Sequence, residues 1–246
     1  MPDGPVFLSM ACIGAAAGAN VLGGLVVARR TWDARLLRYF VALGAGFMLA
    51  AVLLKLVPES MRLSPTAPAL ILGGYLLVHL FEHTVAPHFH FGEETHHEHH
   101  HDRAVAVSAL IGLTVHSFFD GVTIGSSFLI DHALGLLLFT AILLHKAPEG
   151  FAIASIVLAG NGTRSQAIGA SCLIGAASIA GGIVMLARPA LVDWALPVSA
   201  GVTLYVAASD LVPEVNKETG TAIAVTVFAG VVLYYLTELL LHAFGI

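Results

Sequence analysis

The chain has 246 residues, of which 57% are hydrophobic and 11% charged, and its mean hydropathy is +0.87. An ordinary soluble domain has about 25% charged residues, so this composition excludes a soluble globular protein. The formal net charge of −5 comes from residues that lie mostly between the apolar runs, and we expect no nucleic-acid partner.

A helix needs about 20 mostly apolar residues to span a bilayer, and eight such runs follow one another along the chain. We predict transmembrane helices at 5–28, 36–57, 68–86, 104–128, 133–159, 165–187, 193–213 and 220–244. The runs are continuous, whereas barrel strands would alternate apolar and polar residues over about 10 positions. The sequence therefore predicts an all-α polytopic membrane protein, with one transporter domain over 1–246 and a His-rich loop at 87–103.

Lys and Arg are unevenly distributed between the predicted helices. Seven of them lie near the connections that follow the first, third, fifth and seventh helices: Arg29, Arg30, Arg35, Arg38, Arg103, Arg164 and Lys217. The opposite side has only Arg62 and Arg188. The positive-inside bias therefore predicts that both termini lie outside the cytoplasm, and we expect a bacterial-type inner (plasma) membrane.

The second and seventh predicted helices share a pattern. Residues 46–59 read GFMLAAVLLKLVPE and residues 201–214 read GVTLYVAASDLVPE, so G-x-x-L is followed seven residues later by LVPE in both. The two helices cross the membrane in opposite directions, which predicts an inverted repeat of helices 1–3 and 6–8 around helices 4 and 5. Inverted repeats are common in transporters, whose substrate sites lie near the bilayer midplane. The alternative is that LVPE simply ends two unrelated helices.

A second repeat carries the polar residues of the predicted membrane interior. The fourth helix contains HSFFDGVTIG (116–125) and the fifth contains HKAPEGFAIA (145–154), both of the form H-x-x-x-[D/E]-G-x-x-I. Positions i and i+4 share one face of a helix, so His116 lies beside Asp120 and His145 beside Glu149. Each helix therefore supplies half of a metal site.

Two imidazoles and two carboxylates suit Zn²⁺ and also accept Fe²⁺, Mn²⁺, Co²⁺ or Cd²⁺. A charged carboxylate at mid-membrane costs at least about 2.5–3.5 kcal/mol, and a bound divalent cation offsets that cost. The alternative is a set of structural polar residues that satisfy one another. Pro148 is expected to bend the fifth helix. Gly121 and Gly150 are expected to permit close helix approach or local unwinding, and plain packing is the alternative.

Lys146 follows the histidine of the fifth helix. Its ammonium cannot bind a metal while protonated, and beside two carboxylates it lowers the local negative charge, which favours one bound ion over two. The alternative is a structural lysine that pairs with Glu149 or extends to the membrane surface.

The stretches HSFFDG, HKAPEG, KLVPES and LYVAASDLVPEV resemble the ZIP (Zrt/Irt-like) family of divalent-metal transporters, over essentially the whole chain. The resemblance implies eight helices, both termini outside, a histidine-bearing cytoplasmic loop after the third helix, and a homodimer. It also implies transport of Zn²⁺ or similar ions into the cytoplasm by an elevator-like slide of helices 1, 4, 5 and 6.

By motif position, the family's metal ligands correspond to His116, Asp120, His145 and Glu149. Ser117 stands where the family often has Asn, and Lys146 where two-metal members have an acidic residue. The sixth predicted helix also lacks the acidic residue of those members, so the resemblance makes Lys146 a charge substitute for a second metal. Met48 stands where some members place a thioether near the metal, and core packing is the alternative.

Other polar residues extend from this site. The stretch HFHFGEETHHEHHH (88–101) has seven histidines and three glutamates in the predicted cytoplasmic loop, and it is either a metal acceptor or sensor or a solvated linker. Its histidines are His88, His90, His96, His97, His99, His100 and His101.

His79, Glu82 and His83 share a face of the third helix, as part of an exit route or as interfacial polar residues. Asp210 and Lys55 are equivalent in the inverted repeat, which suggests either a structural pairing or an access filter for the metal.

The sequence therefore predicts a transporter that takes up Zn²⁺ by alternating access, with Fe²⁺, Mn²⁺ and Cd²⁺ as further candidate substrates. No G-x-x-x-x-G-K-[S/T] occurs, so no ATP site is indicated. The expected partners are the metal ions, the lipid bilayer and a second copy of the chain. Rival interpretations are an intramembrane zinc hydrolase, in which the same ligands would activate a water, and a metal sensor that does not transport.

Overall fold

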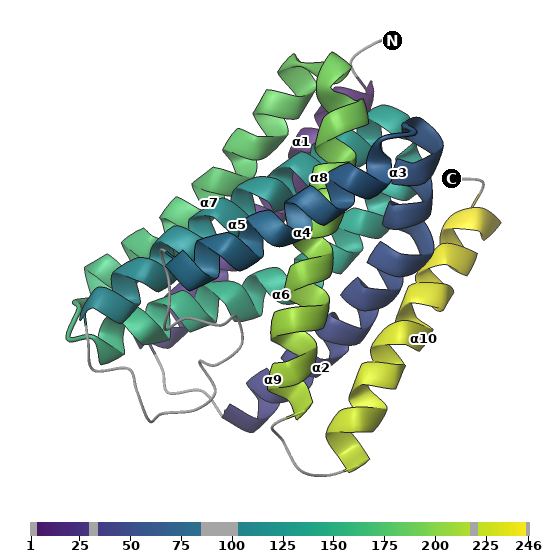
Figure 1. Cartoon of the computed structure of the whole chain (residues 1–246). Helices are drawn as coiled ribbons and strands as arrows, with labels where there is room; N and C mark the ends of the chain where they lie inside the picture. The colour runs from purple at the N-terminus through teal and green to yellow at the C-terminus, as the bar shows by residue number, and fades with distance from the viewer. Residues whose placement is uncertain (1–3, 30–33, 85–102, 217–220, 245–246) are drawn as a thin grey trace.

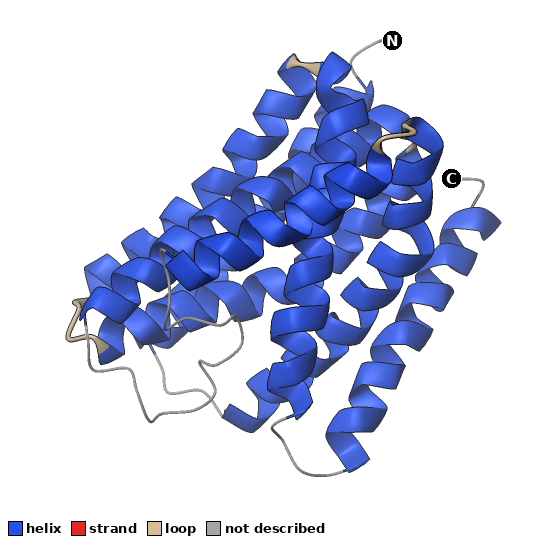
Figure 2. Ribbon diagram, in the orientation of Figure 1, coloured by secondary structure: helices blue, strands red, loops and turns tan. Residues whose placement is uncertain are grey.

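The structure is a computed structural model that describes residues 4–29, 34–84, 103–216 and 221–244. Helices and short connecting turns make up this part of the chain, and it contains no strand (Figure 2). The elements are α1 (Gly4–Arg29), α2 (Ala34–Ala51), η1 (Val52–Leu56), α3 (Val57–Leu63), α4 (Ala67–Thr84), α5 (Arg103–Ile130), α6 (His132–Ala159), α7 (Arg164–Ala187), η3 (Pro189–Leu191), α8 (Val192–Tyr205), η4 (Val206–Leu211), α9 (Val212–Asn216) and α10 (Thr221–Ala243).

These elements correspond to the eight predicted spans. α2, η1 and α3 form the second span, and η3, α8, η4 and α9 form the seventh. Among the described residues, seven helices are long and apolar enough to cross a membrane. The remaining predicted span is α4, which has 18 residues and is made more polar by the histidines and glutamate near its end. The predicted all-α polytopic fold class is confirmed.

The second span is longer than predicted. We expected it to end at residue 57, before Pro58, but the helical path continues to Leu63. Pro58 lies in the first turn of α3, directly after the π-helical turn η1, where a missing N–H is tolerated. A second π-helical turn, η4, lies before Pro213 in the seventh span. Both turns therefore occupy equivalent places in the two copies of the repeat.

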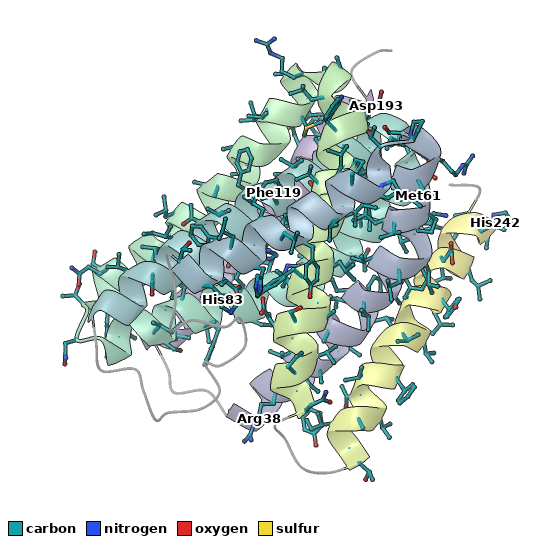
Figure 3. All side chains as sticks on the ribbon, in the orientation of Figure 1. Arg38, Met61, His83, Phe119, Asp193 and His242 are labelled. Carbon is teal, nitrogen blue, oxygen red and sulfur yellow. The ribbon has the colours of Figure 1, made fainter. Side chains whose placement is uncertain are left out.

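The helices form two groups (Figure 1). α1, α5, α6 and α7 pack against one another, while α2 packs with α10 and α4 with α8 in the other group. The groups meet where α2 lies against α6 and α5 lies against α8. Arg38 and His83 lie at one end of the molecule, and Asp193, Met61 and His242 lie at the opposite end (Figure 3).

Glycines make equivalent close contacts in the two copies of the repeat. A Cβ on Gly46 would lie 2.0 Å from the backbone oxygen of Val227, and one on Gly201 would lie 1.9 Å from that of Ile71. Since no side chain fits at such distances, α2 touches α10 through backbone, and α8 touches α4 in the same way. The α2–α10 contact and the α8–α4 contact are therefore equivalent, as an inverted repeat predicts.

The metal-motif glycines repeat this arrangement in the other group. A Cβ on Gly121 of α5 would lie 1.8 Å from the Ser178 backbone oxygen of α7, and one on Gly150 of α6 would lie 1.8 Å from that of Asn20 in α1. The glycines after the two carboxylates therefore permit backbone contact between helices, as one of our two interpretations predicted.

The structure also aligns the third and eighth spans, which the sequence pattern did not. A Cβ on Gly74 of α4 would lie 2.1 Å from a backbone oxygen of α8, and one on Gly230 of α10 would lie 2.2 Å from one of α2. Once these glycines are matched, residues 74–82 and 230–238 share G-x-x-L-x-x-L-x-E. Glu82 and Glu238 are therefore equivalent positions, near opposite ends of the molecule.

Candidate metal site

The two motif helices bring four side chains together in the interior. His116 and Asp120 come from α5, and His145 and Glu149 come from α6. One ligand atom from each lies within 4.8 Å of all the others, and all four residues are buried. The i, i+4 spacing on each helix and the packing of α5 on α6 thus bring four candidate ligands together. We call these four residues the four-ligand cluster.

Two distances within the four-ligand cluster are close to those of a metal's coordination shell. Asp120 Oδ2 lies 3.1 Å from His116 Nε2 and 3.4 Å from His145 Nε2. Bonds of about 2.0 Å to a tetrahedral metal place neighbouring ligand atoms about 3.3 Å apart. His145 Nδ1 lies 3.1 Å from the Ala141 backbone oxygen, where an Nδ1–H donor leaves Nε2 for a metal. The geometry therefore fits one divalent ion.

Lys146 lies between the two carboxylates. Its Nζ is 2.6 Å from Asp120 Oδ2 and 2.5 Å from Glu149 Oε2, and it donates to Ser117 Oγ at 2.7 Å. The Ser117 hydroxyl in turn donates to Glu149 Oε1. The lysine is 0% exposed, so it pairs with carboxylates rather than extending to the surface. Ser117 and Lys146 therefore belong to the same polar network as the four ligands.

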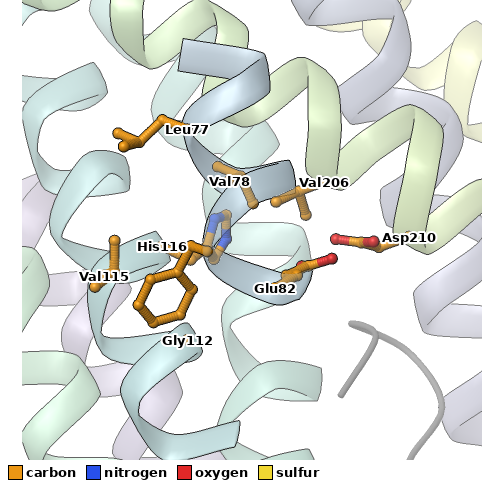
Figure 4. A pocket seen from close by; sticks show the side chains of 9 residues that line it. Leu77, Val78, Glu82, Gly112, Val115, His116, Val206 and Asp210 are labelled. Carbon is orange, nitrogen blue, oxygen red and sulfur yellow. The ribbon is translucent and has the colours of Figure 1, made fainter. Parts of the chain in front are cut away.

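A cavity of about 100 Å³ leads away from His116 between α4, α5 and η4, and we call it the α4–α5 cavity. Glu82 and Asp210 line it, with their carboxylates pointing toward one another (Figure 4). Tyr205 donates a hydrogen bond of 2.8 Å to Glu82 Oε2 and orients that carboxylate. One water needs about 10–15 Å³, so the cavity has room for water beside the four-ligand cluster.

The other predicted residues lie elsewhere. His79 and His83 are exposed, with ring centroids 4.1 Å apart, and neither lines the α4–α5 cavity. Met48 is fully buried within the main apolar cluster, as core packing would have it. The histidines of 88–101 lie outside the described residues.

The suggested pairing of Lys55 with Asp210 is wrong. Lys55 Nζ lies 3.3 Å from Glu238 Oε1, while Asp210 lies in the α4–α5 cavity at the other end. Lys55 and Asp210 line different cavities, so the two side chains do not pair. Sequence reasoning missed Glu238 as a partner. The pattern shared by the third and eighth spans relates Glu238 to Glu82, and it does not indicate Lys55.

Residues 92–238, more than half of the chain, match the family model described as ZIP zinc transporter. The chain belongs to the ZIP zinc transporter family. Zinc transporter zipt-7.2 of Caenorhabditis elegans is 23% identical over 150 residues, 55% of this chain and 32% of that protein. Human zinc transporter SLC39A7 is 31% identical over 114 residues, 42% of this chain and 24% of that protein. The zinc transporter ZIP13 homolog of Drosophila melanogaster is 29% identical over 116 residues, 44% of this chain and 33% of that protein.

The chain thus spans about a quarter to a third of the length of these curated ZIP relatives. The family match and the seven described helices that are long and apolar enough to cross a membrane identify this ZIP chain as an integral membrane protein. The resemblance drawn from HSFFDG and HKAPEG is confirmed at the level of the family.

Proposed function

We propose that this protein moves a divalent transition-metal cation, with Zn²⁺ as its main substrate and Fe²⁺, Mn²⁺ and Cd²⁺ as further candidates, into the cytoplasm. The buried four-ligand cluster carries this proposal, because its residue types and the short distances from Asp120 to both histidines are compatible with one divalent ion. It contains no thiolate, which suits a site that must release its metal again.

The charges favour one ion per chain. With neutral imidazoles, the carboxylates of Asp120 and Glu149 and the Lys146 ammonium sum to −1 (−2 + 1). One divalent ion changes this to +1 and a second would change it to +3. Unit charges 4 Å apart interact by about 4 kcal/mol at an effective dielectric constant of 20, so a second ion is strongly disfavoured. Lys146 therefore takes the place of a second metal.

The exit route runs through the α4–α5 cavity. Glu82 and Asp210 provide two carboxylates between His116 and the end of α4, where the His-rich loop 88–101 begins a few residues later in the chain. Carboxylates here lower the free energy of a cation that leaves the four-ligand cluster. The loop then accepts the released metal. With the positive-inside bias, this end faces the cytoplasm and both termini face outside.

The division into two helix groups supports alternating access. The group that holds the four-ligand cluster slides against the group formed by α2, α4, α8 and α10, and a homodimer steadies the second group in the bilayer. The close backbone contacts at glycines such as Gly121 and Gly46 lie within each group, which supports motion of the groups as units.

The test is uptake of Zn²⁺ by proteoliposomes that contain the purified protein. Glu149→Ala and His145→Ala should each abolish flux, because each removes a ligand. His132→Ala removes an exposed histidine at the start of the same helix and should leave flux near wild type. Near-normal transport by either ligand variant would show that the ligand assignment is wrong. Turnover of peptide or lipid without flux would favour the hydrolase.

A further inference from the structure

A second pocket lies between η1, α6 and α10, and we call it the α6–α10 pocket. Its volume is about 380 Å³, and Lys55, Glu238 and His242 are among the residues that line it. One water needs about 10–15 Å³, so this pocket has room for many water molecules. His242 lies at the end of the molecule opposite Arg38 and His83 (Figure 3).

The α6–α10 pocket is the repeat counterpart of the α4–α5 cavity. Glu238 is equivalent to Glu82, and Lys55 is equivalent to Asp210, from the glycine contacts and the LVPE frame. The α4–α5 cavity therefore has two carboxylates, whereas the α6–α10 pocket has a carboxylate paired with an ammonium. The pocket also lies between the two helix groups, because α6 belongs to one and α10 to the other.

The pocket holds the same pair of ligand types as the four-ligand cluster. Glu238 and His242 are four residues apart on α10, so a carboxylate and an imidazole share one face of the helix and line one pocket. This is the spacing of His116 with Asp120 and of His145 with Glu149, and both ligand types bind Zn²⁺.

A lysine is paired with a glutamate both in the four-ligand cluster and in the α6–α10 pocket, and the two ion pairs differ in strength. Lys146 holds Glu149 in the buried interior, with both side chains 0% exposed. Lys55 holds Glu238 at 3.3 Å, with the side chains 37% and 40% exposed. Water screens such an exposed pair, so an arriving divalent cation displaces Lys55 far more easily than Lys146.

We propose that Glu238 and His242 form a capture site for a hydrated divalent cation on the uptake side of the protein, with Lys55 holding Glu238 until the cation arrives. This inference rests on the proposed transport function and its direction. The α6–α10 pocket keeps water around the ion, which later loses that water at the four-ligand cluster. The capture site raises the local metal concentration and sets the concentration dependence of uptake.

Initial Zn²⁺ uptake by proteoliposomes, measured against external Zn²⁺, tests the capture site. Glu238→Gln and His242→Ala should each raise KM by about three- to tenfold, with kcat within about twofold of wild type. Lys55→Gln removes the competing ammonium and should lower KM by about two- to fivefold. Asp193→Asn removes an exposed carboxylate at the same end, outside the pocket, and should leave KM unchanged.

An exchange-inert cation separates capture from a structural effect. Hexaamminecobalt(III) has the size of a hydrated metal ion but cannot shed its ligands, so it can occupy the α6–α10 pocket and not the four-ligand cluster. It should inhibit Zn²⁺ uptake competitively in the wild type, and at least about threefold more weakly in Glu238→Gln. Equal inhibition of both proteins would overturn the capture site.

The outcomes distinguish the two proposals. If the wild type transports Zn²⁺ and His145→Ala does not, but Glu238→Gln and His242→Ala keep the wild-type KM, the capture site is wrong and transport stands. A loss of kcat at unchanged KM in Glu238→Gln also contradicts capture, because it indicates a role in the moving step. If the wild type shows no flux for any metal, the proposed function itself fails.

Discussion

Replacing Lys146 with Met removes a buried ammonium and keeps an unbranched side chain of similar length. The lysine is 0% exposed and Asp120 is 1% exposed, with 2.6 Å between Nζ and Oδ2. Glu149, at 2.5 Å, is also 0% exposed. The variant leaves two carboxylates in the interior without their cation. Removing one partner of a buried ion pair costs about 3–5 kcal/mol, and we expect Lys146→Met to lose that much stability when metal is absent.

Thermal unfolding in detergent with a chelator measures this loss. A change of 1 kcal/mol shifts the Tm of a domain of about 150–250 residues by about 2–4 °C, so the Tm of Lys146→Met should fall by about 6–20 °C. Lys55→Met is the matched control, because its ion pair with Glu238 is 37% and 40% exposed. An exposed pair contributes about 0–1 kcal/mol, so the control should lose at most about 4 °C.

Added Zn²⁺ should reverse the loss in Lys146→Met. A divalent ion replaces the missing positive charge, and a ligand at 100 times its Kd stabilises the folded state by about 2.7 kcal/mol. The Zn²⁺-induced rise in Tm should therefore be larger in Lys146→Met than in the wild type, where the ammonium competes for the same carboxylates. Equal Tm losses in Lys146→Met and Lys55→Met, or equal Zn²⁺ effects in variant and wild type, would refute the charge-substitute role.

Three further predictions follow from the site and its surroundings. Lys146→Asp should bind one more Zn²⁺ per chain than the wild type in elemental analysis of the purified protein, because it adds a ligand and removes the competing cation. Gly150→Ala should lower the Tm through overpacking worth about 1–3 kcal/mol, since its Cβ would lie 1.8 Å from a backbone oxygen of α1. Gly14→Ala is the control: its Cβ would meet no atom within 4 Å, so its Tm should equal or slightly exceed that of the wild type. Glu82→Gln with Asp210→Asn should lower kcat for Zn²⁺ uptake by at least about threefold while changing KM little, because these carboxylates act after the metal has bound; unchanged kcat contradicts the exit route.

The sequence predicted the helical elements and the half-sites because both depend on local spacing. The apolar runs fix where helices form, and the i, i+4 spacing places His116 beside Asp120 without any knowledge of tertiary structure. The sequence offered one argument that the His116–Asp120 face of α5 contacts the His145–Glu149 face of α6. That argument was the repetition of the motif. The residue type of Lys146 predicted its charge effect, but its position between two carboxylates required the packed structure.

Features that depend on distant segments were not predictable. Lys55 and Glu238 are 183 residues apart, and nothing in the local sequence of either indicates the other. The sequence pattern that aligns Glu82 with Glu238 is hard to recognise, because the Leu and Val residues around it occur in any membrane helix. The π-helical turns at Val52–Leu56 and Val206–Leu211 have dissimilar sequences, so only backbone geometry identifies them.

Lys55 carries a positive charge and Asp210, its equivalent in the inverted repeat, a negative one. This charge difference makes the two faces of the molecule electrostatically unequal. In a carrier that couples to no second ion, microscopic reversibility forbids such a difference from driving the metal against its electrochemical gradient. Exchanging the two residues should therefore alter the half-saturation concentration on each face and the resting occupancy of the two orientations. The ratio of the metal concentrations on the two sides of the membrane at which net flux is zero should not change.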